Sequence, residues 1–271
     1  MTTYRNYTRK ARAITVVVLT TVVALCACLK KPTTDAAGTA GSTNQTEASP
    51  SPLPFPTDSA RLKMTSDAGS AEVYLDYPKG HDAAAREAKA FIRSQLFGDR
   101  PTEPTDDAEA LARRYCELTL QGFEHSLQQL NFSEVSHEQA PEEGMEIRLV
   151  FVSDQYITYE SWHYAYFTGG GHGTYGTQGL TIRRSDGKRM NHLAKDSERL
   201  RHLMVQGLMD YFGVSDEASL ADYLTVPLDL LPMPAHPPYL TADGLRFQYE
   251  LYDICRMDDG APAFTIPLDS L

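Results

Sequence analysis

Residues 145–167 read MEIRLVFVSDQYITYESWHYAYF, two runs of strand-like sequence joined by a polar turn. Residues 153–155 supply the turn, and Tyr156–Phe167 runs back as an aromatic-rich segment. In the first run, apolar side chains occupy every second position: Met145, Ile147, Leu149 and Phe151. Successive side chains of a strand point to opposite faces, so this pattern predicts an antiparallel hairpin.

Alternation along strands and the roughly 3.6-residue period of helices predict the other elements of the folded part. Asp106, with Glu109 three residues later, resembles a capping box and is expected to begin a helix. The predicted strands are 71–77, 178–184, 239–241, 245–251 and 264–267, and the predicted helices are 82–97, 106–130, 196–212 and 215–224. Hairpins outnumber strand–helix–strand units, so the sequence predicts an α+β fold, a mostly antiparallel sheet with helices packed on one face.

Residues 1–27 have the pattern of a bacterial lipoprotein signal peptide. A basic start precedes the uncharged run Ala13–Leu25, which is shorter than the roughly 20 apolar residues of a membrane-spanning helix. The run ends Leu-Cys-Ala-Cys at 25–28, which resembles a lipobox whose cysteine, Cys28, is acylated and becomes the new N-terminus. An uncleaved membrane anchor is the alternative. Either interpretation places the rest of the chain outside the cytoplasm.

Composition separates a tether from the folded part and limits the partners. Residues 28–58 are rich in Thr, Ser, Ala, Gly and Pro, which predicts a disordered tether. Residues 1–27 hold four basic and no acidic side chains, so the remainder carries 21 basic and 36 acidic ones, a formal charge of −15. This charge argues against nucleic acid as a partner. It allows a cationic partner, although solubility alone also explains it.

A glycine cluster follows the hairpin. Five glycines fall within residues 169–176, a pattern typical of a tight, exposed chain reversal. The candidate ligand-binding residues in and beside this loop are Tyr166, Gly169, Gly170, Gly171, His172 and Tyr175. Three roles for His172 remain open: its ring bonds a backbone carbonyl and holds the loop, it contacts a ligand, or it acts as an acid or base.

The sequence predicts no catalytic residue, no metal site and no cofactor. It lacks a Gly-x-Ser-x-Gly elbow, a phosphate loop and a dinucleotide fingerprint, and its histidines are scattered. Cys116 and Cys255 lie outside the signal and are a candidate disulfide; two separate buried thiols are the alternative. The aromatic side chains of 156–175 either form an exposed binding surface or a strand buried on both sides.

Several segments, taken in order, carry a resemblance to a known family: Tyr166–His172, Asp186–Lys188, Tyr239–Phe247 and Gly260–Pro267. They resemble domain-of-unknown-function family 3298 (DUF3298), which is similar to the extracytoplasmic part of the anti-sigma factor RsiV and the non-catalytic domain of the deacetylase PdaC. Residues 59–163 resemble the family's usual N-terminal companion, family 4163. The resemblance implies two α+β regions, 59–163 and 164–271.

The resemblance also implies a binding module more than an enzyme, since the anti-sigma relative is a receptor for lysozyme. We therefore expect a non-catalytic, extracytoplasmic module, anchored to a membrane by its N-terminal lipid. Its expected ligand is an envelope component, such as peptidoglycan fragments, or a protein such as lysozyme. The alternative is an envelope hydrolase acting on peptidoglycan or polysaccharide with His172 as acid or base.

The lipobox assignment predicts the behaviour of two cysteine variants. Replacing Cys28 by Ser removes the thiol that takes the lipid, so Cys28→Ser is expected to lose labelled palmitate and to keep the mass of its signal segment. Cys26→Ser is the matched control and should remain acylated and shortened. Label incorporation and intact mass measure both effects, and a labelled Cys28→Ser chain contradicts the assignment.

Overall fold

The fold comes from a computed structural model that describes residues 54–101, 103–130, 140–167, 172–191 and 197–271. These residues form eight strands in two sheets, together with four α-helices. All but one of the strand pairs are antiparallel. The predicted α+β class, with a mostly antiparallel sheet, is therefore confirmed. None of the described helices combines the length and the apolar character that crossing a membrane requires.

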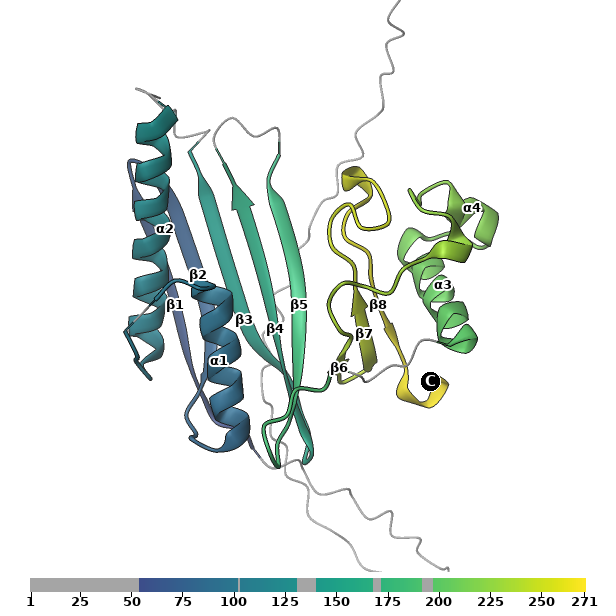
Figure 1. Cartoon of the computed structure of the whole chain (residues 1–271), viewed down its shortest axis with the longest axis horizontal. Helices are drawn as coiled ribbons and strands as arrows, with labels where there is room; N and C mark the ends of the chain where they lie inside the picture. Colours follow the sequence, from purple (N-terminus) through teal and green to yellow (C-terminus); the bar gives the residue numbers. More distant parts are fainter. Residues whose placement is uncertain (1–53, 102, 131–139, 168–171, 192–196) are drawn as a thin grey trace, which may run out of the picture. The chain divides into compact units, whose positions relative to one another are not determined.

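The larger sheet has five strands that lie side by side in chain order (Figure 1). They are β1 (Thr57–Ser66), β2 (Gly69–Pro78), β3 (Glu142–Val152), β4 (Tyr156–Tyr166) and β5 (Thr174–Arg183). Only β2 and β3 are parallel, and the chain between them contains two helices. Parallel neighbours need such a crossover because a tight turn cannot join them. The hairpin predicted from residues 145–167 is confirmed as β3 and β4.

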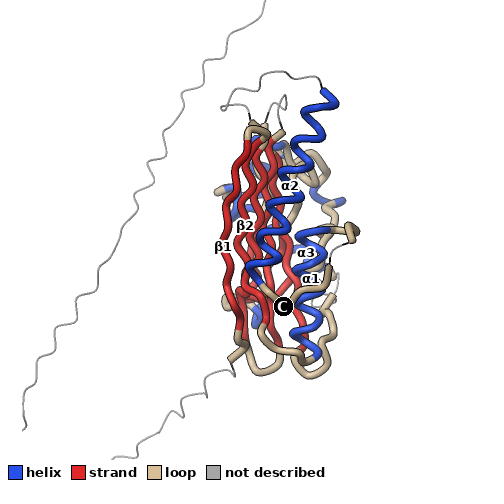
Figure 2. Tube along the Cα trace, turned by 90° about the vertical axis from the view of Figure 1, so that its left-hand side faces the viewer, coloured by secondary structure: helices blue, strands red, loops and turns tan. Residues whose placement is uncertain are grey.

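Two helices, α1 (Ala83–Phe97) and α2 (Ala108–Leu130), cover one face of this sheet (Figure 2). Val73 and Leu75 of β2 are fully buried beneath them, as the alternation of the strand predicts. Helix α1 begins because the Asp82 carboxylate accepts a hydrogen bond from Ala85 N at 2.8 Å. It ends at Gly98, where φ is 56°, a value that glycine adopts without steric cost.

The predicted cap of α2 was wrong by one residue. Asp107, not Asp106, accepts the hydrogen bond from a first-turn amide, Ala110 N, at 3.0 Å. Asp106 is engaged elsewhere: it accepts a hydrogen bond from the Tyr77 hydroxyl at 3.1 Å and pairs with Lys89 Nζ at 3.2 Å. Hydrogen bonds from Lys89 and Tyr77 lower the pKa of Asp106. This tertiary contact outcompetes the local capping pattern.

Several strands also differ from the prediction: the strand predicted at 245–251 ends at Gln248, and two further differences bear on the site. Strand β1 was missed, and its first two residues belong to the segment 28–58 that was predicted to be a tether. Strand β5 begins at Thr174 rather than at 178, so Gly176 lies in a strand and not in a loop. The reason lies in packing: the His163 ring comes within 2.6 Å of the position that a Gly176 Cβ would occupy. That glycine makes room for a neighbouring side chain.

The C-terminal part forms a second, smaller core. Strands β6 (Tyr239–Thr241), β7 (Gly244–Gln248) and β8 (Ala263–Ile266) form an antiparallel sheet against which α3 (Glu198–Phe212) packs, with α4 (Glu217–Ala221) beside it. Short 3₁₀ turns lie at Leu228–Leu230, Met257–Asp259 and Leu268–Ser270. The centre of this core is fully buried and consists of Met204, Leu208, Leu245, Phe247 and Ile254. Phe151 and Tyr156 from the larger sheet pack against it.

The two sheets meet where β6 lies on β5. The Tyr239 ring occupies the space above Gly179, where an added Cβ would come within 2.2 Å of ring atoms. The Tyr239 hydroxyl donates to Glu160 Oε2 at 2.6 Å, and Leu240 N donates to the buried Thr181 hydroxyl at 2.9 Å. By register, Gly179, Glu160 and Thr181 lie on the sheet face opposite α1 and α2. The smaller sheet therefore covers the β5 end of that face.

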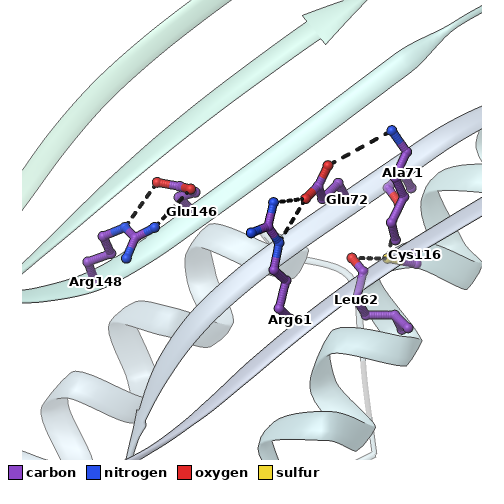
Figure 3. A network of polar contacts seen from close by, with 8 residues as sticks. Arg61, Leu62, Ala71, Glu72, Cys116, Glu146 and Arg148 are labelled. Atoms are coloured by element: carbon purple, nitrogen blue, oxygen red, sulfur yellow. Dashed lines mark hydrogen bonds and ion pairs between the residues drawn. The ribbon is translucent and has the colours of Figure 1, made fainter. Parts of the chain in front are cut away.

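Of the two alternatives for the cysteines, the structure has two free, buried thiols rather than a pair. Cys116 lies beneath β1 and β2, with Sγ 3.6 Å from the Ala71 carbonyl oxygen (Figure 3). Cys255 donates instead to Gly260 O at 3.3 Å. Burial raises the pKa of both thiols to about 11, which keeps them protonated and unreactive at neutral pH.

The predicted boundary between the two regions, at 163/164, falls inside β4, and the division into two regions stays a prediction.

The contact between Gly179 and Tyr239 predicts that two alanine variants on one sheet face differ in stability. Gly179→Ala forces the Tyr239 ring out of its place and is expected to lower the free energy of unfolding by about 1–3 kcal/mol. Gly144→Ala is the matched control, because the nearest atom to its added Cβ lies 3.8 Å away, an ordinary contact. Thermal unfolding measures both, and equal stability of the two variants contradicts this account of the junction.

Candidate functional site

The candidate site lies on the face of the larger sheet opposite α1 and α2, which we call the open face. Strand register defines it row by row, since paired residues point to the same side. One row runs Arg61, Tyr74, Glu146, Trp162 and Thr177, and the next runs Lys63, Glu72, Gly144, Tyr164 and Tyr175. In these rows the charged residues thus come from β1 to β3, and the aromatic residues come from β4 and β5, together with Tyr74 of β2.

Most charges on the open face are paired with one another (Figure 3). Arg61 Nη2 lies 2.7 Å from Glu72 Oε1, and Arg148 Nε lies 3.0 Å from Glu146 Oε2. The Arg148 guanidinium also stacks over the Tyr74 ring, 4.1 Å from its centroid. Hydrogen bonding to Glu146 raises the pKa of Arg148, so this side chain stays charged. The pairs hold guanidinium and carboxylate groups side by side at the sheet surface.

A depression of about 250 Å³ lies between these pairs and the aromatic side chains. Gly144 is at its floor, because it presents no side chain to the open face. We call this depression the Gly144 hollow. Its other lining side chains on the open face are Arg61, Lys63, Ser70, Glu72, Tyr74, Glu142, Glu146, Trp162 and Tyr164. The hollow therefore combines donors, acceptors and aromatic surface within one small space.

The aromatic wall of the hollow is formed by Trp162 and Tyr164. They stand two residues apart on one strand, so both point to the open face, with parallel rings whose centroids are 6.4 Å apart. Trp162 is 39% exposed, although it is a large apolar side chain. The Tyr164 ring leans over Gly173, where an added Cβ would lie 2.5 Å from ring atoms. The backbone at Gly173 thus positions one wall of the hollow.

A second aromatic group lies beyond the β5 edge. The hydroxyls of Tyr175 and Tyr211 both approach Gly260, where an added Cβ would lie 3.4 Å and 2.7 Å from them. His172 is exposed: Nδ1 lies 3.1 Å from Gly173 O, and Nε2 lies 3.4 Å from the Tyr252 hydroxyl. Tyr252 is 57% exposed and has a φ of 70°, the only positive φ of a non-glycine residue in the described chain. Such backbone strain is concentrated at functional sites.

The structure brings some of the predicted site residues together. Tyr166 and Tyr175 lie on the open face, on either side of Tyr164. His172 contacts a backbone carbonyl, as its proposed loop-holding role requires, and it also contacts Tyr252. Gly169, Gly170 and Gly171 lie outside the described residues. A binding role for the predicted set stays a prediction.

Sequence analysis missed most of the hollow. Arg61, Glu72, Gly144 and Glu146 come from three strands and carry no motif, so only pairing in the sheet brings them to one place. The one available signal was alternation in β1, where Ala60 is buried and Arg61 is exposed. That pattern would have added a strand with a basic outer face.

A larger cavity, of about 660 Å³, lies on the helix side of the sheet. One of its two acidic side chains, Glu143, accepts a hydrogen bond from the buried Tyr115 hydroxyl at 2.8 Å, and Thr119 Oγ1 lies 3.4 Å from the same oxygen. Burial, with the nearby Glu143 charge, raises the pKa of Tyr115. Because these groups satisfy each other within the core, we place the candidate site in the Gly144 hollow instead. Nowhere in the described ranges do three His, Cys, Asp or Glu side chains gather to hold a metal ion.

No protein-family model and no curated protein matches the sequence. Among solved structures, the chain is similar to a member of the DUF3298 family from Bacteroides fragilis, with a TM-score of 0.62 and 20% identity over 79% of this chain and 91% of that one. It is also similar to a DUF3298 family protein from Pseudomonas aeruginosa, with a TM-score of 0.52 and 17% identity over 81% of this chain and 93% of that one. The chain thus has the fold of two solved DUF3298 family proteins.

Proposed function

We propose that this protein is a lipid-anchored, extracytoplasmic binding module of the cell envelope that holds its ligand on the open face and catalyses no reaction. The observation that carries the proposal is the uncovered aromatic and ion-paired surface around the Gly144 hollow. Helices cover the other face of the same sheet, whereas Trp162 remains 39% exposed on this one. Exposed Trp and Tyr side chains are enriched where proteins bind ligands, because they bury much area with few rotamers.

The location rests on the sequence alone. The signal pattern and Cys28 lie in residues 1–28, outside the described part of the chain. A tether of about 30 residues between Cys28 and β1 would hold the folded part away from the bilayer. The membership of the DUF3298 family that the sequence resemblance implies is supported by the shared fold. That family resemblance favours a binding module.

Two ligand classes follow from the proposal. Peptidoglycan fragments suit an envelope protein whose binding surface offers rings and hydrogen-bonding groups. A cationic protein such as lysozyme suits the formal charge of −15 outside the signal, since opposite charges speed encounter and favour the correct partner. Both ligands are expected to contact the same open face.

The hydrolase alternative has less support. A general base must lie within hydrogen-bond reach of the group that it deprotonates. Within the described residues, no Ser, Thr or Cys side chain is hydrogen-bonded to His172, whose two ring nitrogens face Gly173 O and the Tyr252 hydroxyl. These contacts fit a residue that orders the rim of a binding surface.

The proposal predicts binding without turnover. Titration calorimetry of the full chain with lysozyme, and separately with soluble peptidoglycan fragments, is expected to show micromolar binding of at least one. Trp162→Ala should weaken it at least about tenfold, because a central aromatic contact is lost. Leu230→Ala is the matched control, since Leu230 is 67% exposed and lies in a 3₁₀ turn of the C-terminal part, outside the hollow.

Two results contradict the proposal. One is the absence of heat with both ligands. The other is a shortening of the peptidoglycan fragments, measured by chromatography, that the parent causes and that a folded His172→Ala variant does not. That second outcome would establish the hydrolase instead.

A further inference from the structure

We propose that the Gly144 hollow is a sugar subsite, in which one pyranose ring of a neutral glycan stacks on Trp162 and hydrogen-bonds to the Arg61–Glu72 pair and to Glu146. This inference rests on the proposed binding function and names the ligand class for it. The structure offers three independent features in its favour: the size of the hollow, its aromatic wall and its ion-paired polar groups.

The size of the hollow suits a single ring. Its volume of about 250 Å³ is below the ~300–1,000 Å³ of pockets that enclose a drug-sized ligand. Gly144 forms the floor, and the nearest atom to its missing Cβ is Trp162 Cζ3 at 3.8 Å. A pyranose ring therefore has access to the Trp162 side chain through space that any larger residue at position 144 would fill.

The aromatic wall suits the C–H face of a sugar. The face of an indole ring is electron-rich, and the axial C–H groups of a pyranose are weakly positive, so the two surfaces attract each other while shedding water. Trp162 is available for this contact. Arg148 lies over Tyr74, but in the described chain no cation lies over the Trp162 ring.

The ion pairs suit hydroxyl groups. A hydroxyl both donates and accepts, so neighbouring hydroxyls on a sugar need a donor and an acceptor close together. Arg61 with Glu72 presents N–H groups beside carboxylate oxygens at 2.7 Å, and Glu146, held by Arg148 at 3.0 Å, adds further acceptor oxygens to the hollow. Because each pair is already held together, little side-chain conformational entropy is lost when these groups are oriented for a ligand.

At Glu72 and Glu146, existing ion pairs favour a neutral ligand over a cationic side chain. Glu72 faces both Arg61, at 2.7 Å, and Lys63, at 4.0 Å, and Glu146 is bonded by Arg148. An incoming Arg or Lys would have to displace one of these partners, so it would gain little Coulomb energy at an exposed surface. A polyhydroxylated ligand adds hydrogen bonds without breaking a pair.

The chain offers a direct probe, because Trp162 is its only tryptophan. The full chain, in a detergent without a sugar head group, is titrated to ~10 mM with the neutral tetramers of β-1,4-linked N-acetylglucosamine, β-1,4-glucose and α-1,4-glucose while Trp162 fluorescence is recorded. At least one tetramer is expected to shift the emission saturably. The affinity should be unchanged between ~50 and ~500 mM NaCl, because a neutral ligand is not screened.

A matched pair of valine variants locates the effect. Gly144→Val fills the hollow with a residue suited to strands and is expected to weaken binding about tenfold or more. Thr177→Val places the same side chain on the other side of Trp162, outside the hollow, and should bind as the parent does. Thermal unfolding confirms that both variants are folded, and Trp162→Phe supplies the fluorescence blank.

The outcomes separate this inference from the proposed function. No emission change with any tetramer, or binding that Gly144→Val leaves intact, overturns the sugar subsite. If lysozyme nevertheless binds the parent in titration calorimetry, with an affinity that falls steeply as NaCl rises, the binding module stands with a cationic protein as its ligand. If neither the tetramers, nor lysozyme, nor peptidoglycan fragments bind, both the inference and the proposed function fail.

Discussion

The arrangement of the whole C-terminal part depends on one close contact, the Tyr239 ring against Gly179. A strand residue without a side chain lets an aromatic ring lie directly on the sheet backbone. The same ring sends its hydroxyl to Glu160, and its neighbour Leu240 donates to the buried Thr181 hydroxyl. These polar contacts lie between two apolar cores, so they fix the position of β6 more sharply than apolar packing alone would. Where β6 lies decides how much of the open face remains uncovered.

On the part of the open face that the smaller sheet leaves uncovered, arginine–glutamate pairs hold the charged side chains in place. An exposed ion pair contributes little to folding stability, typically below ~1 kcal/mol. The rows of Arg, Glu and Tyr side chains on β1 to β3 therefore do more to shape the surface than to hold the sheet together. They place guanidinium and carboxylate groups at defined points around Gly144, and they face an aromatic wall from β4. One face of the sheet is covered by helices and contributes stability, and the ion-paired face is left free for contact. This difference underlies the binding function proposed for the chain.

The fold shared with the two solved structures does not by itself specify a function. At 20% and 17% identity, the two DUF3298 family structures agree with this chain in fold, but folds host many unrelated functions. The function therefore has to be argued from individual side chains. The two most informative are Trp162, large and exposed on a strand, and Tyr252, which combines exposure, a positive φ and a contact with His172. Neither feature improves the packing of a core, so each points to contact with a ligand.

Local sequence patterns determined the elements of this protein well where one face of a strand or helix is buried. The hairpin of residues 145–167, helix α1 and the α+β class all follow from periodicity that acts within a few residues. Local pattern failed where a distant group competes: Lys89 draws Asp106 away from the start of α2, and His163 fills the space beside Gly176. The Gly144 hollow was beyond sequence analysis altogether. Alternation shows that a strand has two faces, but only the order β1 to β5 and the covering helices decide which face is open and which residues from four strands meet there.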